Sequence, residues 1–272
     1  MKEVIEEIHK EDLELVKFFI EICNKNNLKY YIIGGTLLGA IRHRGFIPWD
    51  DDMDLAMPRE DYEQFLQIMN ENKGKYKIFN YKKDKEYKYY ISRLCNTDFE
   101  IEEITGNITN LFIDIFPIDG MPNNSILRKI HAIRILYHRV KLSFYYNDTI
   151  DKTRKRKFYE KILIKLATTI PFKKIINPLK EKNKIDKLLN KYSFYNKKYA
   201  GTIMGAYRTR EIVPTVFFGK PTAYEFEDIQ LYGPEMYDEY LTHMYGKYMK
   251  LPKKEEQKIH CKELRRIRWK EF

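Results

Sequence analysis

The pattern of apolar and polar positions predicts a β-sheet flanked by helices. Residues 11–27 and 59–72 repeat apolar side chains at helical spacing, which predicts two amphipathic helices. Residues 30–33 and 111–117 are short, apolar, β-favouring runs, which predicts two strands, the second buried on both faces. Residues 75–96 mix short β-like segments with lysines. Strands therefore alternate with helices through the first part of the chain.

The pattern becomes helical after residue 124. Residues 123–125 suggest a helix cap, and residues 126–146 read as a helix, followed by further helices interrupted at Pro171 and Pro178. The C-terminal part returns to mixed structure. Strands are expected over 200–206 and 226–232, with a helix over 234–245. The expected division is a catalytic core over 1–124, a basic helical insertion over 125–198 and a C-terminal part over 199–272 that completes the core.

A glycine pair ends the first predicted strand. Gly34 and Gly35 let the backbone bend sharply and bring its N–H groups close to a ligand. Thr36 is a suitable N-cap for the helical turn that follows, and a helix N-terminus there would favour a phosphate. Most turns of this kind have no ligand, so this pattern alone is weak evidence.

Three aspartates alternate with other residues after the short helix and loop that follow this turn. If the segment is a strand, Asp52 and Asp54, together with Asp50, share one face while Met53 and Leu55 point into a core. Crowded carboxylates repel each other, and a divalent cation relieves that repulsion. Oxygen ligands suit Mg²⁺ or Mn²⁺. A solvated acidic loop is the alternative, which the interleaved apolar residues disfavour.

Asp114 is the single acid of the predicted strand over 111–117. A buried carboxylate needs a cationic or metal partner, although a hydrogen-bonded structural role is the alternative. Arg93 ends a β-like run and could reach a phosphate or lie on the surface. Asp119 and Gly120 read as a turn.

The string GGTLLGAIRHRGFIPWDDDMDLAMPR, over residues 34–59, resembles the LicD family. Members of that family transfer phosphocholine or a related phosphoalditol from a CDP-linked donor to a glycan. Weaker resemblance to the same family, and to its fukutin-type relatives, covers residues 113–122 and 226–252. The resemblance implies an α+β fold, with a nucleotidyltransferase-like mixed sheet flanked by helices and interrupted by a helical insertion.

The resemblance also implies roles for individual residues. An acceptor hydroxyl would attack the phosphorus distal to cytidine and release CMP, with Mg²⁺ or Mn²⁺ bridging the phosphates. Donor or phosphate contacts are expected from Gly34, Gly35, Thr36, Arg42, His43 and Arg93. Metal ligands are expected to be Asp50, Asp52, Asp54 and Asp114, of which Asp52, Asp54 and Asp114 are the catalytic acids. Helix-surface roles are nearly as plausible for Arg42 and His43, and choline is implied by the resemblance alone.

Charge is distributed unevenly along the chain. The net charge is +11, and residues 151–200 hold 16 Lys and Arg against 4 Asp and Glu, so this segment carries all the excess positive charge. Solvated surface, contact with anionic lipid and attraction of a polyanionic acceptor all explain it. Those three readings remain open.

Composition limits the compartment and the partners. The chain is 43% hydrophobic and 33% charged, as in globular proteins, its first residues do not resemble a signal peptide, and no apolar run approaches a membrane span. Three cysteines without paired spacing suit a reducing cytosol. We therefore expect a cytoplasmic protein with peripheral contact at the inner face of the membrane. Expected partners are CDP-choline or a similar CDP-alcohol and a glycan or lipid-linked glycan acceptor, with no nucleic acid.

Other functions use similar residues. Nucleotidyl transfer to RNA or a small molecule would release pyrophosphate from the same core. A calcium loop matches the spacing of Asp50, Asp52 and Asp54, but Leu55 replaces the turn glycine. A nucleic-acid-binding module would explain the basic insertion and leave the acids unused. His260 lies near a histidine that family members often carry, although a lone surface histidine is the simpler interpretation.

Overall fold

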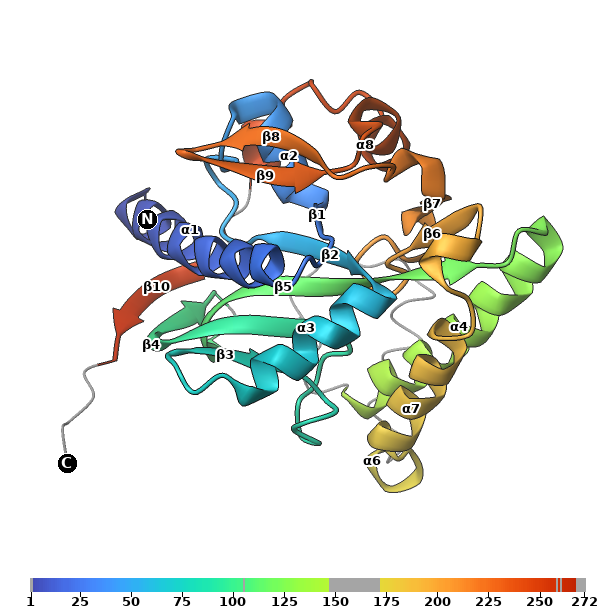
Figure 1. Ribbon diagram of the computed structural model, residues 1–272. Helices are drawn as coiled ribbons and strands as arrows, with labels where there is room; N and C mark the ends of the chain where they lie inside the picture. The colour runs from blue at the N-terminus through green and yellow to red at the C-terminus, as the bar shows by residue number, and fades with distance from the viewer. Residues whose placement is uncertain (1, 105, 147–171, 258, 260, 268–272) are drawn as a thin grey trace.

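Helices flank a mixed β-sheet in an α+β fold (Figure 1). The computed structural model describes residues 2–104, 106–146, 172–257, 259 and 261–267. The expected fold class is confirmed. His260 and residues 151–171 of the basic segment lie outside the described residues.

The main sheet has the strand order β1–β2–β5–β4–β10. β2 and β5 are parallel, and the other neighbours in this order are antiparallel. β3 also pairs with β4, while β6 pairs with both β5 and β7. The strands of this sheet are β1 Tyr31–Ile32, β2 Asp54–Pro58, β3 Tyr76–Phe79, β4 Ser92–Glu103, β5 Ile108–Met121, β6 Tyr199–Gly201, β7 Ile212–Pro214 and β10 Cys261–Arg266.

The helices lie around this sheet (Figure 1). α1 and α3 pack on the sheet, α4 packs against α7, and a separate hairpin of β8 and β9 contacts α2 and β1. The α-helices are α1 Lys2–Lys25, α2 Gly34–His43, α3 Arg59–Glu71, α4 Ser125–Tyr145, α6 Phe172–Ile175, α7 Pro178–Leu189 and α8 Tyr237–Tyr245. The hairpin comprises β8 Thr222–Phe226 and β9 Ile229–Gly233, and the short 3-10 helices are η2 Phe194–Asn196, η3 Arg208–Glu211, η4 Thr215–Phe217 and η5 Lys254–Glu256.

One face of the sheet belongs to the main hydrophobic core. Ile113 and Ile115 of β5 are fully buried there in the same cluster as Phe19 of α1 and Phe65 of α3. Successive strand residues point to opposite faces, so Asp114 points away from α1 and α3. The predicted burial of this strand is therefore correct for one face, while the other face carries the candidate site.

The helices predicted over 11–27, 59–72, 126–146 and 234–245 are present, and the first is longer than predicted. α3 buries the expected stripe, and the Asn124 side chain caps α4 by accepting hydrogen bonds from the backbone N–H groups of Ile126 and Leu127. α1 begins at Lys2 rather than near residue 11, because Ile5 and Ile8 continue its buried face.

Several expectations about local structure were wrong. Thr36 is not an N-cap, because α2 already begins at Gly34 after Ile33. Asp119 and Gly120 do not form a turn but continue β5, where they pair with β6. Pairing with a distant strand outweighed the local turn preference of an Asp-Gly sequence.

The C-terminal strands also differ from the pattern. Residues 226–232 do not form one strand. They span the end of β8, a turn at Glu227 and Asp228, and most of β9, and Glu227 in the turn has a φ of 51°. The predicted strand over 200–206 ends at Gly201. β2 begins only at Asp54, so Asp50 and Asp52 lie in the segment before the strand, although Met53 and Leu55 are fully buried as expected.

Candidate active site

Three charged residues form a row across the middle of the sheet. Asp54 of β2 is paired in register with Asp114 of β5, and Asp114 is paired in register with Arg93 of β4. Residues paired in this way point to the same face of a sheet. The Arg93 Nε donates a hydrogen bond to the Asp114 Oδ1 over 2.9 Å, so the cationic partner expected for Asp114 is Arg93.

The Arg93 guanidinium is also held by aromatic rings. Its central carbon lies 4.0 Å from the centre of the Tyr89 ring and 3.6 Å from that of Phe112. Only 12% of the Arg93 side chain and 13% of the Asp114 side chain are exposed. The pair is therefore fixed in place at the edge of a cavity.

The glycine turn packs directly against the acids. Gly34 has a φ of 56°, a conformation that favours glycine, and a Cβ atom there would lie 2.6 Å from the Asp54 Oδ2. A Cβ atom on Gly35 would collide with the Asp50 carboxylate. The Thr36 Oγ1 accepts a hydrogen bond from the Asp54 backbone N–H over 2.8 Å. These contacts explain why small residues lie beside the acidic segment.

A cavity of about 450 Å³ opens over this row of charges. It brings together five of the residues singled out in the sequence, which are Gly34, Asp52, Asp54, Arg93 and Asp114. α4, the segment from β6 to η3 and α8 supply much of the remaining wall. Residues far apart in the chain thus meet at one site.

Five other predicted residues do not line this cavity. Gly35 and Thr36 lie in the first turn of α2, where Gly35 packs close to the Asp50 carboxylate and Thr36 accepts a hydrogen bond from the Asp54 backbone N–H. Arg42 and His43 lie at the end of α2, where the Arg42 Nε donates to the His43 Nε2 over 2.9 Å. The Arg42 Nη1 donates to the Tyr248 backbone oxygen over 3.0 Å, so Arg42 links α2 to the C-terminal part of the chain.

Asp54 and Asp114 both have a pKa above that of free aspartate. Burial raises the pKa of Asp114 to about 6, against the opposing effect of the Arg93 charge. Burial, then the negative charges of Asp52 and Asp114, raise the pKa of Asp54 well above its usual range. The Arg93 guanidinium therefore offsets only part of the negative charge on these two acids, and an additional cation would relieve the remainder.

The donor atoms suit a hard divalent cation, although they do not form a complete cage. Within the described part of the chain, no three Asp, Glu, His or Cys side chains are arranged to hold a metal ion together. Mg²⁺ usually takes one or two carboxylates and completes its octahedral shell with water and substrate phosphates. Asp52 and Asp54, which both line the cavity, fit such a shared site.

The cavity also contains charged residues that the sequence did not single out. Arg139 of α4 donates from Nη1 to the backbone oxygens of Ile203 and Gly205, over 2.9 Å and 2.7 Å. The Glu211 carboxylate accepts a hydrogen bond from the Tyr207 backbone N–H over 2.7 Å and another from the Thr202 hydroxyl. These two side chains hold the 202–207 loop against the cavity. Arg139 lies in a helix rich in basic residues, so nothing in its local sequence distinguishes it.

Tyrosines form the aromatic part of the wall. Tyr89, Tyr207, Tyr240 and Tyr245 all line the cavity, and the rings of Tyr207 and Tyr245 meet edge to face at 5.7 Å. The abundance of tyrosine, 22 in the whole chain, gave no indication of which ones lie at the site.

Comparison with known proteins identifies the family. Residues 27–176 match the family described as LicD/FKTN/FKRP, nucleotidyltransferase domain. The chain is similar to the lipopolysaccharide cholinephosphotransferase LicD of Haemophilus influenzae, with 29% identity over 259 residues that cover 91% of this chain and 92% of that protein. It is also similar to the ribitol 5-phosphate transferase FKRP of Mus musculus, with 27% identity over 116 residues that cover 43% of this chain and 22% of that protein. The chain therefore belongs to the LicD family of phosphotransferases.

Proposed function

We propose that this protein transfers phosphocholine from CDP-choline to a hydroxyl group of a glycan or lipid-linked glycan and releases CMP. The observation that carries the proposal is the row of Asp54, Asp114 and Arg93 at a cavity that also contains Gly34. The near full-length similarity to a cholinephosphotransferase supports the choice of group. A related phosphoalditol is the competing cargo, since a second relative is a ribitol 5-phosphate transferase.

Asp52 and Asp54 would hold Mg²⁺ or Mn²⁺ together with the donor diphosphate. The ion would neutralise negative charge on the phosphate oxygens as the phosphoryl group is transferred. The raised pKa of Asp54 supports this assignment, because a bound cation would favour its ionised form. The left-handed backbone at Gly34 lies close to the same carboxylate, and a residue without a side chain there would leave room for the phosphates.

Asp114 would act as the general base. Its pKa of about 6 leaves the carboxylate ionised at neutral pH yet able to accept a proton. The acceptor oxygen would form a bond to the phosphorus distal to cytidine while the bond from that phosphorus to the bridging oxygen of CMP breaks. The hydroxyl proton would pass to Asp114, and CMP would leave with the electron pair. Arg93 would keep Asp114 in position through its hydrogen bond.

The cavity wall favours a cationic headgroup over a polyol. Its side chains include four tyrosines and the carboxylate of Glu211, and among the residues that the structure describes no Ser, Thr, Asn or Gln lines it. Aromatic faces attract quaternary ammonium groups, whereas polyol hydroxyls are usually met by amide and hydroxyl side chains. Tyr207, which is 45% exposed and packs edge to face on Tyr245, is the most exposed of the four tyrosines.

The decisive assay compares CDP-choline, CDP-ribitol and CDP-glycerol with Mg²⁺ and no acceptor, and measures CMP. We expect slow release of CMP, fastest from CDP-choline and abolished by EDTA. Full activity in EDTA would contradict the metal assignment. Pyrophosphate release from a nucleoside triphosphate, with no turnover of CDP-alcohols, would instead identify a nucleotidyltransferase.

A matched pair of variants tests the headgroup. Tyr207→Leu should raise the KM for CDP-choline roughly tenfold, since a cation–π contact contributes about 1–2 kcal/mol. The KM for CDP-ribitol should not change. Tyr232→Leu is the control, because Tyr232 is 41% exposed and is not part of the cavity wall. An equal rise in KM for both donors would show that Tyr207 does not select the cation.

A further inference from the structure

One face of α4 exposes a continuous row of large apolar side chains. We call this row the apolar stripe; it comprises Ile126, Ile130, Ile133, Tyr137 and Val140. Each of them is between 50% and 67% exposed. Their spacing of four, three, four and three residues places them on one side of a helix.

The stripe is not the side of α4 that forms the core. The core side of α4 buries Ala132, Ile135 and Leu142 in a hydrophobic cluster that also includes residues of α7. α4 and α7 lie side by side in Figure 1. Arg139 faces the active-site cavity. α4 therefore has a core side, a cavity side and an exposed apolar side. An apolar surface of this extent on a folded protein generally marks an interaction site.

Positive charge surrounds the stripe. Lys129 and Arg134 are exposed on either side of it by helical geometry, and residues 120–147 contain no Asp or Glu. The ring of Phe144, at the end of α4, stacks on Phe172 of α6 with ring centres 4.9 Å apart.

This stacking attaches a second exposed, basic segment to the end of the stripe. α6 carries Lys173 and Lys174, both exposed, and Ile175, which is 69% exposed. This surface thus presents exposed apolar side chains beside basic side chains that attract negative charge.

We propose that the apolar stripe and its flanking basic residues bind the surface of an anionic lipid bilayer. A helix with apolar side chains on one face and Lys or Arg beside it lies in the interface between lipid headgroups and acyl chains. A protein partner would need an apolar groove lined by acids, whereas an anionic membrane offers both properties over any area. Among the helices that the structure describes, none is long and apolar enough to cross a membrane, which agrees with binding at the surface.

The position of α4 links this surface to the active site. The same helix contributes Arg139 to the cavity and Leu142 and Ser143 to an adjoining cavity of about 510 Å³. Binding at the stripe would therefore hold these cavities near the membrane, where a lipid-linked acceptor is found. That consequence rests on the proposed function, but the membrane binding itself does not, and it can be measured without catalysis.

Vesicle flotation tests the apolar part of the proposal. The unaltered full chain should float with vesicles of phosphatidylglycerol and phosphatidylcholine and far less with phosphatidylcholine alone. Ile130→Ser combined with Ile133→Ser should weaken partitioning at least about tenfold, because two inserted side chains are lost. The matched control is Val216→Ser combined with Leu251→Ser, which removes two side chains that are 63% and 55% exposed elsewhere. The control should partition like the unaltered chain.

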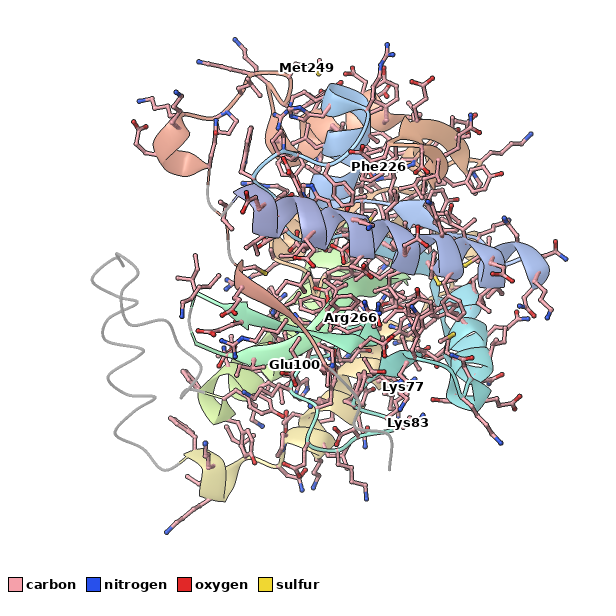
Figure 2. The ribbon with its side chains drawn as sticks, turned by 90° about the vertical axis from the view of Figure 1, so that its left-hand side faces the viewer. Lys77, Lys83, Glu100, Phe226, Met249 and Arg266 are labelled. Atoms are coloured by element: carbon pink, nitrogen blue, oxygen red, sulfur yellow. The ribbon has the colours of Figure 1, made fainter. Side chains whose placement is uncertain are left out.

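Charge neutralisation tests the electrostatic part. Lys129→Gln combined with Arg134→Gln should weaken partitioning about 30-fold at low salt, since each basic residue near an anionic surface contributes about 1 kcal/mol. Lys77→Gln combined with Lys83→Gln is the control, because these two lysines, labelled in Figure 2, are exposed on and after β3, outside the patch. Added salt should reduce the binding of the unaltered chain.

Three outcomes would overturn the proposal. The first is no flotation of the unaltered chain with anionic vesicles, which would mean that another part of the chain or a second copy covers the stripe. The second is a dimer in light scattering that the paired serine substitutions dissociate, which would identify a self-interface. The third is binding that the stripe variants leave unchanged. Circular dichroism melts of every variant should match the unaltered chain, because all the substituted side chains are exposed.

Discussion

Asp114 accepts its hydrogen bond from Arg93 on one neighbouring strand while it stands in register with Asp54 on the other. Two guanidinium groups, those of Arg93 and Arg139, line a cavity that contains the carboxylates of Asp52, Asp54, Asp114 and Glu211. The excess of negative charge is concentrated on the side of Asp54, beside the glycine turn. This asymmetry supports the different roles proposed for the two strand acids, with Asp54 as a cation ligand and Asp114 as the proton acceptor.

The first prediction concerns stability in the absence of metal. Asp54→Asn should raise the melting temperature of the metal-free protein near neutral pH, because it removes a buried charge next to two other acids. The same variant should lose transfer activity by at least about a hundredfold, since an essential charged ligand is gone. Thermal melts with EDTA and a CMP-release assay on the same preparation measure both effects. A lower melting temperature together with full activity would contradict the role of Asp54.

The second prediction concerns pH. The pKa values of Asp54 and Asp114 are raised in the folded state, so folding takes up protons in the range between the ordinary aspartate pKa and the raised values. The stabilisation from Asp114 is complete below about pH 4 and is lost as the pH rises through about 6. For Asp114, the full decrease in the free energy of unfolding is at most about 3 kcal/mol.

Denaturant unfolding at about pH 5 and about pH 7.5 measures this dependence in the metal-free protein. Asp54→Asn should show a smaller loss of unfolding free energy over this interval than the unaltered chain. Mg²⁺ should restore stability to the unaltered chain chiefly at the higher pH, because only ionised carboxylates bind it. Equal stabilisation by Mg²⁺ in the Asp54→Asn variant would place the metal elsewhere.

The third prediction separates Asp114 from the acids that hold the donor. Asp114→Asn keeps the shape of the side chain and removes the charge that receives the proton. Turnover should fall by at least about a hundredfold, while donor binding should stay within roughly tenfold. Calorimetric titration with CDP-choline, beside the CMP-release assay, distinguishes the two effects. Near-normal turnover in a folded variant would make Asp114 a structural partner of Arg93.

The fourth prediction concerns the glycine turn. Gly34→Ala should cost about 1–2 kcal/mol of stability from its left-handed backbone and should also impair donor binding, because the new Cβ would lie 2.6 Å from the Asp54 Oδ2. Gly106→Ala is the matched control, since Gly106 also has a positive φ of 83° but nothing lies within 4 Å of its Cβ position. Gly106→Ala should therefore lose stability but should bind the donor like the unaltered chain. Equal loss of donor binding in both variants would mean that the effect is not local to the site.

The fifth prediction concerns a buried ion pair that supports β5. The Asp119 Oδ1 and Oδ2 accept hydrogen bonds from the Arg59 Nε and Nη2, over 2.7 Å and 2.8 Å. Asp119→Ala should destabilise the fold by about 3–5 kcal/mol, because it leaves the buried guanidinium without its main partner. Mg²⁺ should not rescue this loss, in contrast to its effect on the cavity acids. Denaturant unfolding with and without Mg²⁺ checks both statements, and a loss below about 1 kcal/mol would contradict them.

The sequence alone determined the elements with a strong period and the identity of the central acids. The apolar stripe of α3, the cap of α4 by Asn124 and the burial of Met53 and Leu55 follow from spacing and side-chain chemistry, which are local properties. The string over 34–59 also indicated the family, because it resembles the LicD family at nearly every position from the glycine pair to the acidic strand.

Only the tertiary structure decided which residues share the site. The pairing of Asp114 with Arg93, the continuation of β5 through Asp119 and Gly120, and the position of Arg139 depend on contacts between residues distant in the chain. Local preference could not place them, because strand register and helix packing are set by the whole core. The same reason explains the stripe on α4: periodicity predicted the helix, and only the packing of α7 and the cavity showed which of its faces remains exposed.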